Sequence, residues 1–164
     1  ELSSTFRAGW QGFVSWMAQH EGAVTLFLIT DLLENATFTA LFGEALRRFP
    51  QRLTVGCHGH GHRSWSAWGE DVAGFSAMLA TSTALLKEHA GDAFRPFFRA
   101  PNGYVAPWMA SVLAQHGYTV DSSVNPSWLV AKKAGASWTD VCAAMARAGV
   151  VERPWFTRWS LPVN

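Results

Sequence analysis

The sequence predicts an α/β domain with a parallel sheet, because segments typical of helices and of buried strands alternate along its 164 residues. The strand candidates are short, continuous apolar runs, which fit strands buried on both faces. The helix candidates carry apolar residues at intervals of three and four, and the connections between elements are short. With 49% hydrophobic and 15% charged residues, the chain has the composition of one compact domain, residues 1–164.

Glycine, proline and cap residues mark the ends of these elements. Gly22 closes the first helix, Asn35 is a suitable N-cap for the second, and Pro50 ends it. Further along, Gly91 follows the longest helix and Ser137 caps the last one. The helices are expected at residues 6–20, 37–49, 70–90, 107–116 and 137–148. The strands are expected at residues 24–29, 53–57, 94–98, 118–121 and 149–153.

Residues capable of chemistry follow three of the expected strands. His58 comes after one strand, Arg99 to Tyr104 after the next, and Asp121 to Ser123 after the third. Functional residues gather at the C-terminal ends of parallel strands, so we expect these ends at one rim of the sheet. The forked donors of Arg99, one strand from Asp121, predict a charge-assisted bond between them. A plain salt bridge at the rim explains the pattern equally well.

The first of these strand ends carries three histidines that alternate with two glycines. Neutral imidazole is a ligand for zinc and similar divalent ions. His58 and His62 are the better pair, because Gly59 and Gly61 permit the turn that brings a His-x-x-x-His spacing to one side. On that geometry His60 points elsewhere. The alternatives are a surface loop whose histidines merely titrate or a cloning remnant, and the internal position argues against a tag.

Composition excludes several functions. The net charge of +1, with Lys and Arg scattered singly, indicates no nucleic-acid partner. No apolar run approaches the roughly 20 residues of a transmembrane helix, and the first residues do not resemble a signal peptide. The compartment therefore stays open between cytoplasm and cell envelope, as does the oligomeric state. Cys57 and Cys142 do not read as a disulfide framework, and Cys57 fits a core residue better than a metal ligand.

Nine tryptophans are a large excess for this length. Indole rings stack on the apolar C–H faces of sugars, so exposed tryptophans beside a metal loop would suit a carbohydrate ligand. Ordinary core packing must account for at least half of them. The tryptophans at expected loops are Trp65, Trp68, Trp128, Trp155 and Trp159. The expected core members are Trp10, Trp16 and Trp138.

Several segments carry motifs in a definite order and spacing. They are residues 24–30, the histidine motif at 55–62, the Arg-x-Pro motif at 98–104, the Gly-Tyr-x-x-Asp-Ser-Ser segment at 117–124, and residues 151–154 with 161–162. Together these motifs resemble those of the polysaccharide deacetylase family, which contains the chitooligosaccharide deacetylase homology domain of carbohydrate esterases. The match spans nearly all of the chain.

The resemblance implies a distorted (β/α) barrel, incomplete at both ends, and a site for a divalent metal, most often zinc. His58 and His62 would be metal ligands, and water activated by the ion would attack the acyl carbon. The catalytic set would comprise Asn102, whose backbone N–H binds the developing oxyanion, with Arg99 and Asp121 as a supporting pair. Asn102 stands where the family often has an aromatic residue, so Tyr104 would rebuild the groove wall. The substrate-binding residues would be Pro101, Tyr104, Trp65, Trp68 and His60.

Two family motifs have no match in the sequence. One is the acidic motif that supplies the catalytic base and third metal ligand, and the other is a late motif whose histidine is the general acid. We expect them outside residues 1–164 of a longer protein. Asp31 is a weaker substitute ligand, because it fits the start of a helical segment better. Metal binding by the isolated chain is therefore expected to be weak.

The expected function is that of a metal-dependent hydrolase that removes an N- or O-acyl group, above all acetyl, from an amino sugar of a glycan or glycolipid. Two alternatives stay open. One is a deformylase of a lipid-linked amino sugar, which would use the same residues on a smaller acyl group. The other is a non-catalytic carbohydrate-binding domain that has lost the catalytic acid and base.

Overall fold

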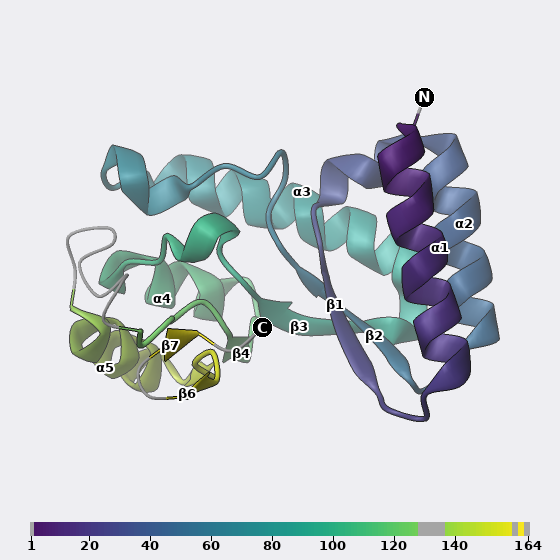
Figure 1. Ribbon diagram of the computed structural model, residues 1–164. Helices are drawn as coiled ribbons and strands as arrows, with labels where there is room; N and C mark the ends of the chain where they lie inside the picture. Colours follow the sequence, from purple (N-terminus) through teal and green to yellow (C-terminus); the bar gives the residue numbers. More distant parts are fainter. Residues whose placement is uncertain (1, 128–136, 159–160, 163–164) are drawn as a thin grey trace.

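The computed structural model describes the chain except residues 1, 128–136, 159–160 and 163–164. Its centre is a five-stranded sheet whose strands are all parallel and follow the order of the sequence (Figure 1). The strands are β1 (Val24–Leu28), β2 (Leu53–Cys57), β3 (Phe94–Phe98), β4 (Val120–Asp121) and β5 (Val151–Glu152). A separate antiparallel pair consists of β6 (Thr157–Arg158) and β7 (Leu161–Pro162).

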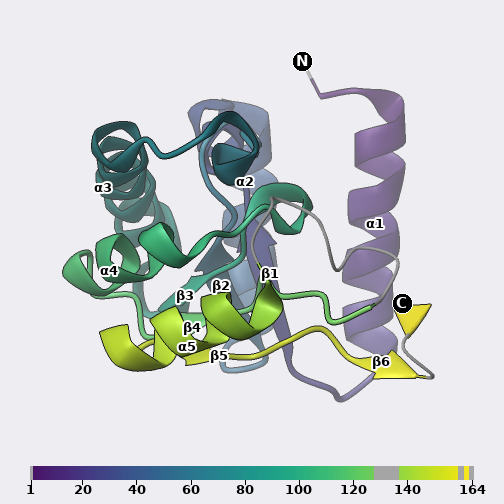
Figure 2. The same ribbon diagram turned by 90° about the vertical axis from the view of Figure 1, so that its left-hand side faces the viewer.

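Helices connect the strands and lie outside the sheet. They are α1 (Ser4–Gln19), α2 (Ala36–Arg48), α3 (Val72–Ala90), α4 (Pro107–Gln115) and α5 (Trp138–Ala148). Short 3₁₀ helices are η1 (Thr30–Glu34), η2 (Trp65–Trp68), η3 (Gly91–Ala93) and η4 (Pro101–Gly103). Figure 2 shows α1 to α4 following one another around the sheet. Among the described helices, none is both long enough and apolar enough to cross a membrane.

The expected alternation of helices and parallel strands is confirmed, as are the caps Asn35, Gly91 and Ser137, whereas α1 ends with His20 and not Gly22 as its C-cap. The side chain of Asn35 accepts hydrogen bonds from two backbone N–H groups at the start of α2, and the Ser137 hydroxyl accepts one, from Asp140 N–H, at the start of α5. Trp10 and Trp138 pack against the core. The expected burial of Trp16 is wrong: 43% of it is exposed, and its ring stacks on His20 at the end of α1.

Aromatic rings fill the space between the sheet and α3. Phe75 of α3 contacts Phe98 of β3 and Trp108 of α4 edge to face, with centroids 5.6 Å apart in both pairs. Phe75 and Phe98 are fully buried. Burial of this kind contributes about 2 kcal/mol for each large side chain. The packing fixes the C-terminal end of β3 relative to α3, next to the histidines.

Backbone pairing continues past the ends of the strands. His58 N–H donates to Leu28 C=O at 2.9 Å, and Arg99 N–H donates to Cys57 C=O at the same distance. Ser122 N–H donates to Phe98 C=O, also at 2.9 Å. The strand ends that carry His58, Arg99 and Asp121 therefore lie side by side at one rim of the sheet, as the alternation of helices and strands predicts.

Candidate functional site

The histidine loop, residues 58–62, curls at the C-terminal end of β2. Gly59 and Gly61 have φ angles of 81° and 68°, in the left-handed region that glycine adopts without strain, and His62 follows at 54°. The imidazole rings of His58 and His62 lie with their centroids 5.2 Å apart. The expected turn, with these two rings on one side, is confirmed.

The tautomer of His58 follows from its hydrogen bond. Its Nδ1 lies 2.7 Å from the carbonyl oxygen of Arg99, which can only accept, so Nδ1 carries the proton. Burial, as the main cause, lowers the pKa of His58, which favours the neutral ring. A neutral ring with its lone pair on Nε2 is the form in which histidine binds metal ions.

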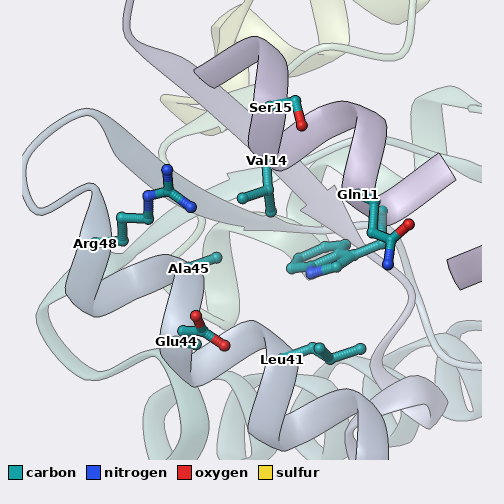
Figure 3. Close-up of a pocket in the computed structure, with 8 residues that line it drawn as sticks. Gln11, Val14, Ser15, Leu41, Glu44, Ala45 and Arg48 are labelled. Carbon is teal, nitrogen blue, oxygen red and sulfur yellow. The ribbon is translucent and has the colours of Figure 1, made fainter. Parts of the chain in front are cut away.

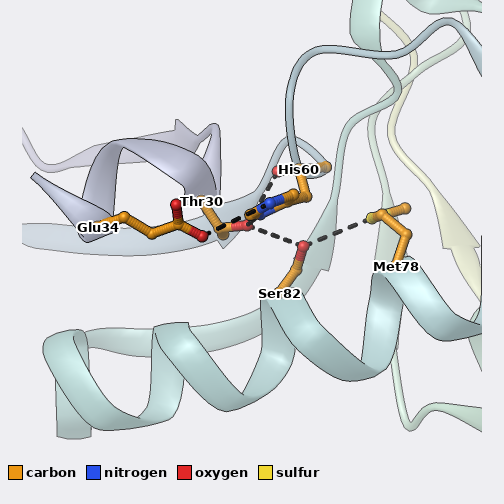
Figure 4. A network of polar contacts seen from close by, with 6 residues as sticks. Thr30, Glu34, His60, Met78 and Ser82 are labelled. Carbon is orange, nitrogen blue, oxygen red and sulfur yellow. Dashed lines mark hydrogen bonds and ion pairs between the residues drawn. The ribbon is translucent and has the colours of Figure 1, made fainter.

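His60 faces away from this pair. Its Nδ1 lies 3.1 Å from the hydroxyl of Thr30, and its Nε2 lies 3.7 Å from the carboxylate of Glu34 (Figure 4). The separation of His60 from the other two histidines therefore agrees with the sequence. Its expected contact with substrate stays a prediction, and its contacts in the structure are with η1.

A cavity of about 590 Å³ opens beside the histidine loop. Its lining residues come from two segments, which we call the first wall (residues 62–68) and the second wall (residues 102–104). They are His62, Arg63, Ser64, Ala67, Trp68, Asn102 and Tyr104. The side-chain amide of Asn102 donates to the Ser64 hydroxyl at 3.0 Å and joins the walls. Four residues expected in the site thus line one cavity: His62, Trp68, Asn102 and Tyr104.

The two tryptophans of the first wall differ. Trp68 is 79% exposed, as a sugar platform requires, whereas Trp65 is only 6% exposed. The guanidinium of Arg63 lies 4.0 Å above the Trp65 ring, and Phe75 meets that ring edge to face. The expectation that Trp65 is exposed for stacking is therefore wrong, because the indole anchors the wall to the core. Trp128 and Trp159 lie outside the described residues.

Pro101 also differs from its expected role. It is buried at the start of η4, where a Cβ placed on Gly59 would lie 3.6 Å from its ring. Its ring therefore packs below the histidine loop and is not presented to a ligand. Asn102, the next residue, is exposed and has a φ of 56°, a left-handed conformation that Asn tolerates better than most residues.

The expected direct bond between Arg99 and Asp121 is absent from the described part of the chain. Arg99 instead donates to the carbonyl of Ser122 at 2.9 Å and to its hydroxyl at 2.8 Å. Trp155 donates to the same carbonyl at 2.9 Å, and the guanidinium lies 5.3 Å above its ring. The forked donors are used by the segment after β4, so Arg99 supports Asp121 through charge and not through contact.

Asp121 has a second carboxyl beside it that the sequence reading missed. Glu152 occupies the matching position on β5, and paired residues on neighbouring parallel strands project to the same face. Burial is the main cause that raises the pKa of both carboxyl groups, and the neighbouring Asp121 raises the pKa of Glu152 further, so the shared proton belongs on Glu152. The buried Oε2 of Glu152 has no partner as a carboxylate, so a proton there would donate to Asp121. No signal in the sequence predicted this pair, because it depends on the register of β4 and β5.

Two imidazoles are the metal-ligand set that the described residues offer. Within that part of the chain, no three His, Cys, Asp or Glu side chains gather closely enough to hold an ion. Asp31 is exposed in the first turn of η1, as its helical position suggests. Cys57 is fully buried, which raises the pKa of its thiol, so it fits the core and not a metal site. The imidazoles of His58 and His62 suit a borderline divalent ion as a partial ligand set.

A second cavity, of about 370 Å³, lies between α1 and α2 and contains none of the expected site residues (Figure 3). Val14, Leu41 and Ala45 form its apolar floor, and Glu44 and Arg48 flank it. These charged residues are four apart on α2 and belong to a solvated helix face. The cavity is a surface groove between two packed helices.

The fold of this chain is similar to those of known proteins. Two solved structures share the fold, each with a TM-score of 0.57. One is a protein from Mycobacterium smegmatis assigned as a polysaccharide deacetylase, with 19% identity over 71% of this chain and 38% of that chain. The other is a family 4 carbohydrate esterase from Streptomyces lividans in complex with acetate, with 17% identity over 93% of this chain and 72% of that chain.

These likenesses confirm the expected α/β fold with a parallel sheet, similar to that of family 4 carbohydrate esterases. The chain spans 38% of the length of the Mycobacterium protein. No curated protein matches the chain. The polysaccharide deacetylase family model matches residues 3–120, which is more than half of the sequence and includes both the histidine loop and the Arg-x-Pro motif. The chain therefore belongs to the polysaccharide deacetylase family.

Proposed function

We propose that the chain contributes to a metal-dependent hydrolase that removes an acetyl group from an amino sugar of a glycan or glycolipid. One observation carries this proposal: the ring of His62, which is paired with that of His58, lines a cavity that also has an exposed indole, Trp68, on its wall. Imidazole pairs suit divalent ions, and indole faces suit sugars. Family membership supports the same chemistry.

In this proposal the residues of the chain divide the work. His58 and His62 would hold a divalent ion, with zinc the best fit to imidazole nitrogen. Such an ion lowers the pKa of water and polarises an acyl carbonyl. The backbone N–H of Asn102 would donate to the acyl oxygen as negative charge develops there. Trp68 and Tyr104 would orient the sugar from opposite walls.

A second candidate is a glycan-binding domain without catalysis. It is favoured by the count of ligands, because the described residues bring two and not three metal-binding side chains together. Such a domain would keep Trp68 and Tyr104 as sugar contacts.

The test is zinc calorimetry together with acetate release from N-acetylated chitooligosaccharides. Zinc should bind the native chain and His89→Ala, a matched control from the last turn of α3. It should not bind His58→Ala or His62→Ala. Unchanged zinc affinity in either loop variant would overturn the assignment of that residue. Saturable binding of the oligosaccharide with no acetate release at any zinc concentration would favour the second candidate.

A further inference from the structure

We infer that Thr30, supported by Ser82, is a positioning residue that holds the histidine loop in the conformation that pairs the rings of His58 and His62 beside the cavity. This inference rests on the proposed role of the loop and deepens it. Thr30 begins η1 directly after β1, and Ser82 lies in the middle of α3. Neither residue lines the cavity beside the loop.

Thr30 contacts the histidine loop through both its backbone and its side chain. Its N–H donates to the carbonyl of Gly59 at 3.0 Å, and its hydroxyl lies 3.3 Å from the same carbonyl. The hydroxyl also lies 3.1 Å from Nδ1 of His60. A hydroxyl both donates and accepts, so it can satisfy His60 whichever ring nitrogen carries the proton. These contacts fall at the centre of the loop, between the two proposed ligands.

Ser82 supports Thr30 from the opposite side. Both residues are fully buried, and their hydroxyl oxygens are 2.9 Å apart (Figure 4). The helix face around Ser82 is apolar, with Met78, Leu79 and Leu86 buried beside it. A buried hydroxyl without a partner costs about 1–3 kcal/mol. Ser82 also donates weakly to the Met78 sulfur at 3.4 Å, and its hydroxyl interacts with the buried Cys57 thiol. The two hydroxyls therefore fix the position of the histidine loop relative to α3.

The loop needs such support because of its backbone. Gly59, Gly61 and His62 have positive φ angles within four residues. His62 is not glycine, and a left-handed conformation at such a residue costs on the order of 1 kcal/mol. The free loop would therefore sample other conformations, in which the two rings separate. Contacts that orient metal ligands from behind are worth about 10- to 100-fold in metal affinity.

The experiment uses amide hydrogen exchange, followed by NMR in the metal-free chain, so that it does not depend on metal binding. Thr30→Val removes the hydroxyl and keeps the shape of the side chain, whereas Thr30→Ser keeps the hydroxyl and removes the methyl group. The matched control is Thr25→Val on β1, because Thr25 makes a similar hydroxyl contact, 2.9 Å to Thr54, away from the loop. Thr30→Val and Ser82→Ala should speed exchange at residues 58–62 about tenfold, with Thr30→Ser and Thr25→Val close to native.

A spectroscopic readout separates positioning from general loss of stability. The ¹⁵N resonance of Nδ1 in His60 should move in Thr30→Val and return in Thr30→Ser. Native exchange at residues 58–62 in Thr30→Val, or equal acceleration in Thr25→Val, would overturn the inference.

Zinc affinity then distinguishes this inference from the proposed function. Thr30→Val should bind zinc about 10- to 100-fold more weakly than Thr30→Ser. A chain that shows the exchange pattern but binds no zinc in its native form would retain the positioning role and refute the metal role. A chain that binds zinc equally well with and without the Thr30 hydroxyl would refute the positioning role alone.

Discussion

The two walls of the cavity are held by different forces. The histidine loop rests on the Thr30 hydroxyl, and the first wall rests on the buried Trp65 indole. The second wall follows Arg99, whose charge lies near the buried carboxyls of Asp121 and Glu152. Charged support can be stronger, but it ties the second wall to the protonation of a carboxyl pair.

The largest expected effect comes from the aromatic anchor of the first wall. Trp65→Ala should lower the free energy of unfolding by about 3–5 kcal/mol, because it empties a buried site against Phe75. Trp68→Ala is the matched control three residues away, and it should change stability by less than about 0.5 kcal/mol, since Trp68 is exposed. Urea unfolding measures both. Equal losses in the two variants would show that the first wall is not anchored by Trp65.

The second wall should respond most to loss of its cation. Arg99→Met removes two hydrogen bonds to Ser122 and the positive charge near the carboxyl pair. The free energy of unfolding should therefore fall by about 3 kcal/mol. The control is Arg95→Met on the same strand, where the exposed guanidinium bonds only nearby carbonyls. Urea unfolding of both variants is the measurement. A loss no greater than that of the control would show that the second wall does not depend on the charge of Arg99.

A smaller effect is expected in the pH dependence of stability. Burial raises the pKa of Glu152 and Asp121 in the folded state, so the folded chain holds a proton that the unfolded chain releases above the ordinary glutamate pKa of 4.5. The stabilisation that this pair contributes is therefore fully present below pH 4.5. It is lost as the pH rises through the raised pKa of the folded state. Glu152→Gln, whose amide can replace the shared proton, should flatten the decline and gain on the order of 1 kcal/mol at alkaline pH.

Unfolding midpoints between about pH 5 and about pH 9 check this result. Glu44→Gln, at an exposed carboxylate of α2, should keep the native profile. A native profile in Glu152→Gln would mean that the pair does not share a proton.

The sequence was sufficient for the features that depend on local pattern. Alternating apolar runs and helical spacing predicted the parallel sheet, and strand order then placed His58, Arg99 and Asp121 at one rim. Gly59 and Gly61 predicted the curl that pairs the histidines, because positive φ angles are a local property of glycine.

The features that the sequence did not reveal depend on tertiary contacts. Trp65 and Trp68 lie in the same short helix, and the contact of Trp65 with Phe75, which is distant enough to lie in another helix, distinguishes the buried indole from the exposed one. Glu152 lies beside Asp121 because of the register between β4 and β5, and strands of two residues are too short for the sequence to predict their register. Thr30 and Ser82 are 52 positions apart and sit in apolar segments where hydroxyls look incidental.

The most direct test of the account is a zinc titration observed through the ¹⁵N resonances of the histidine side chains. The account predicts that Nε2 of His58 and one ring nitrogen of His62 shift together and saturate at the same zinc concentration, while Nδ1 of His60 keeps the resonance set by Thr30. Zinc shifts centred on His60, with those of His58 and His62 unchanged, would contradict the paired site on which the proposed function depends.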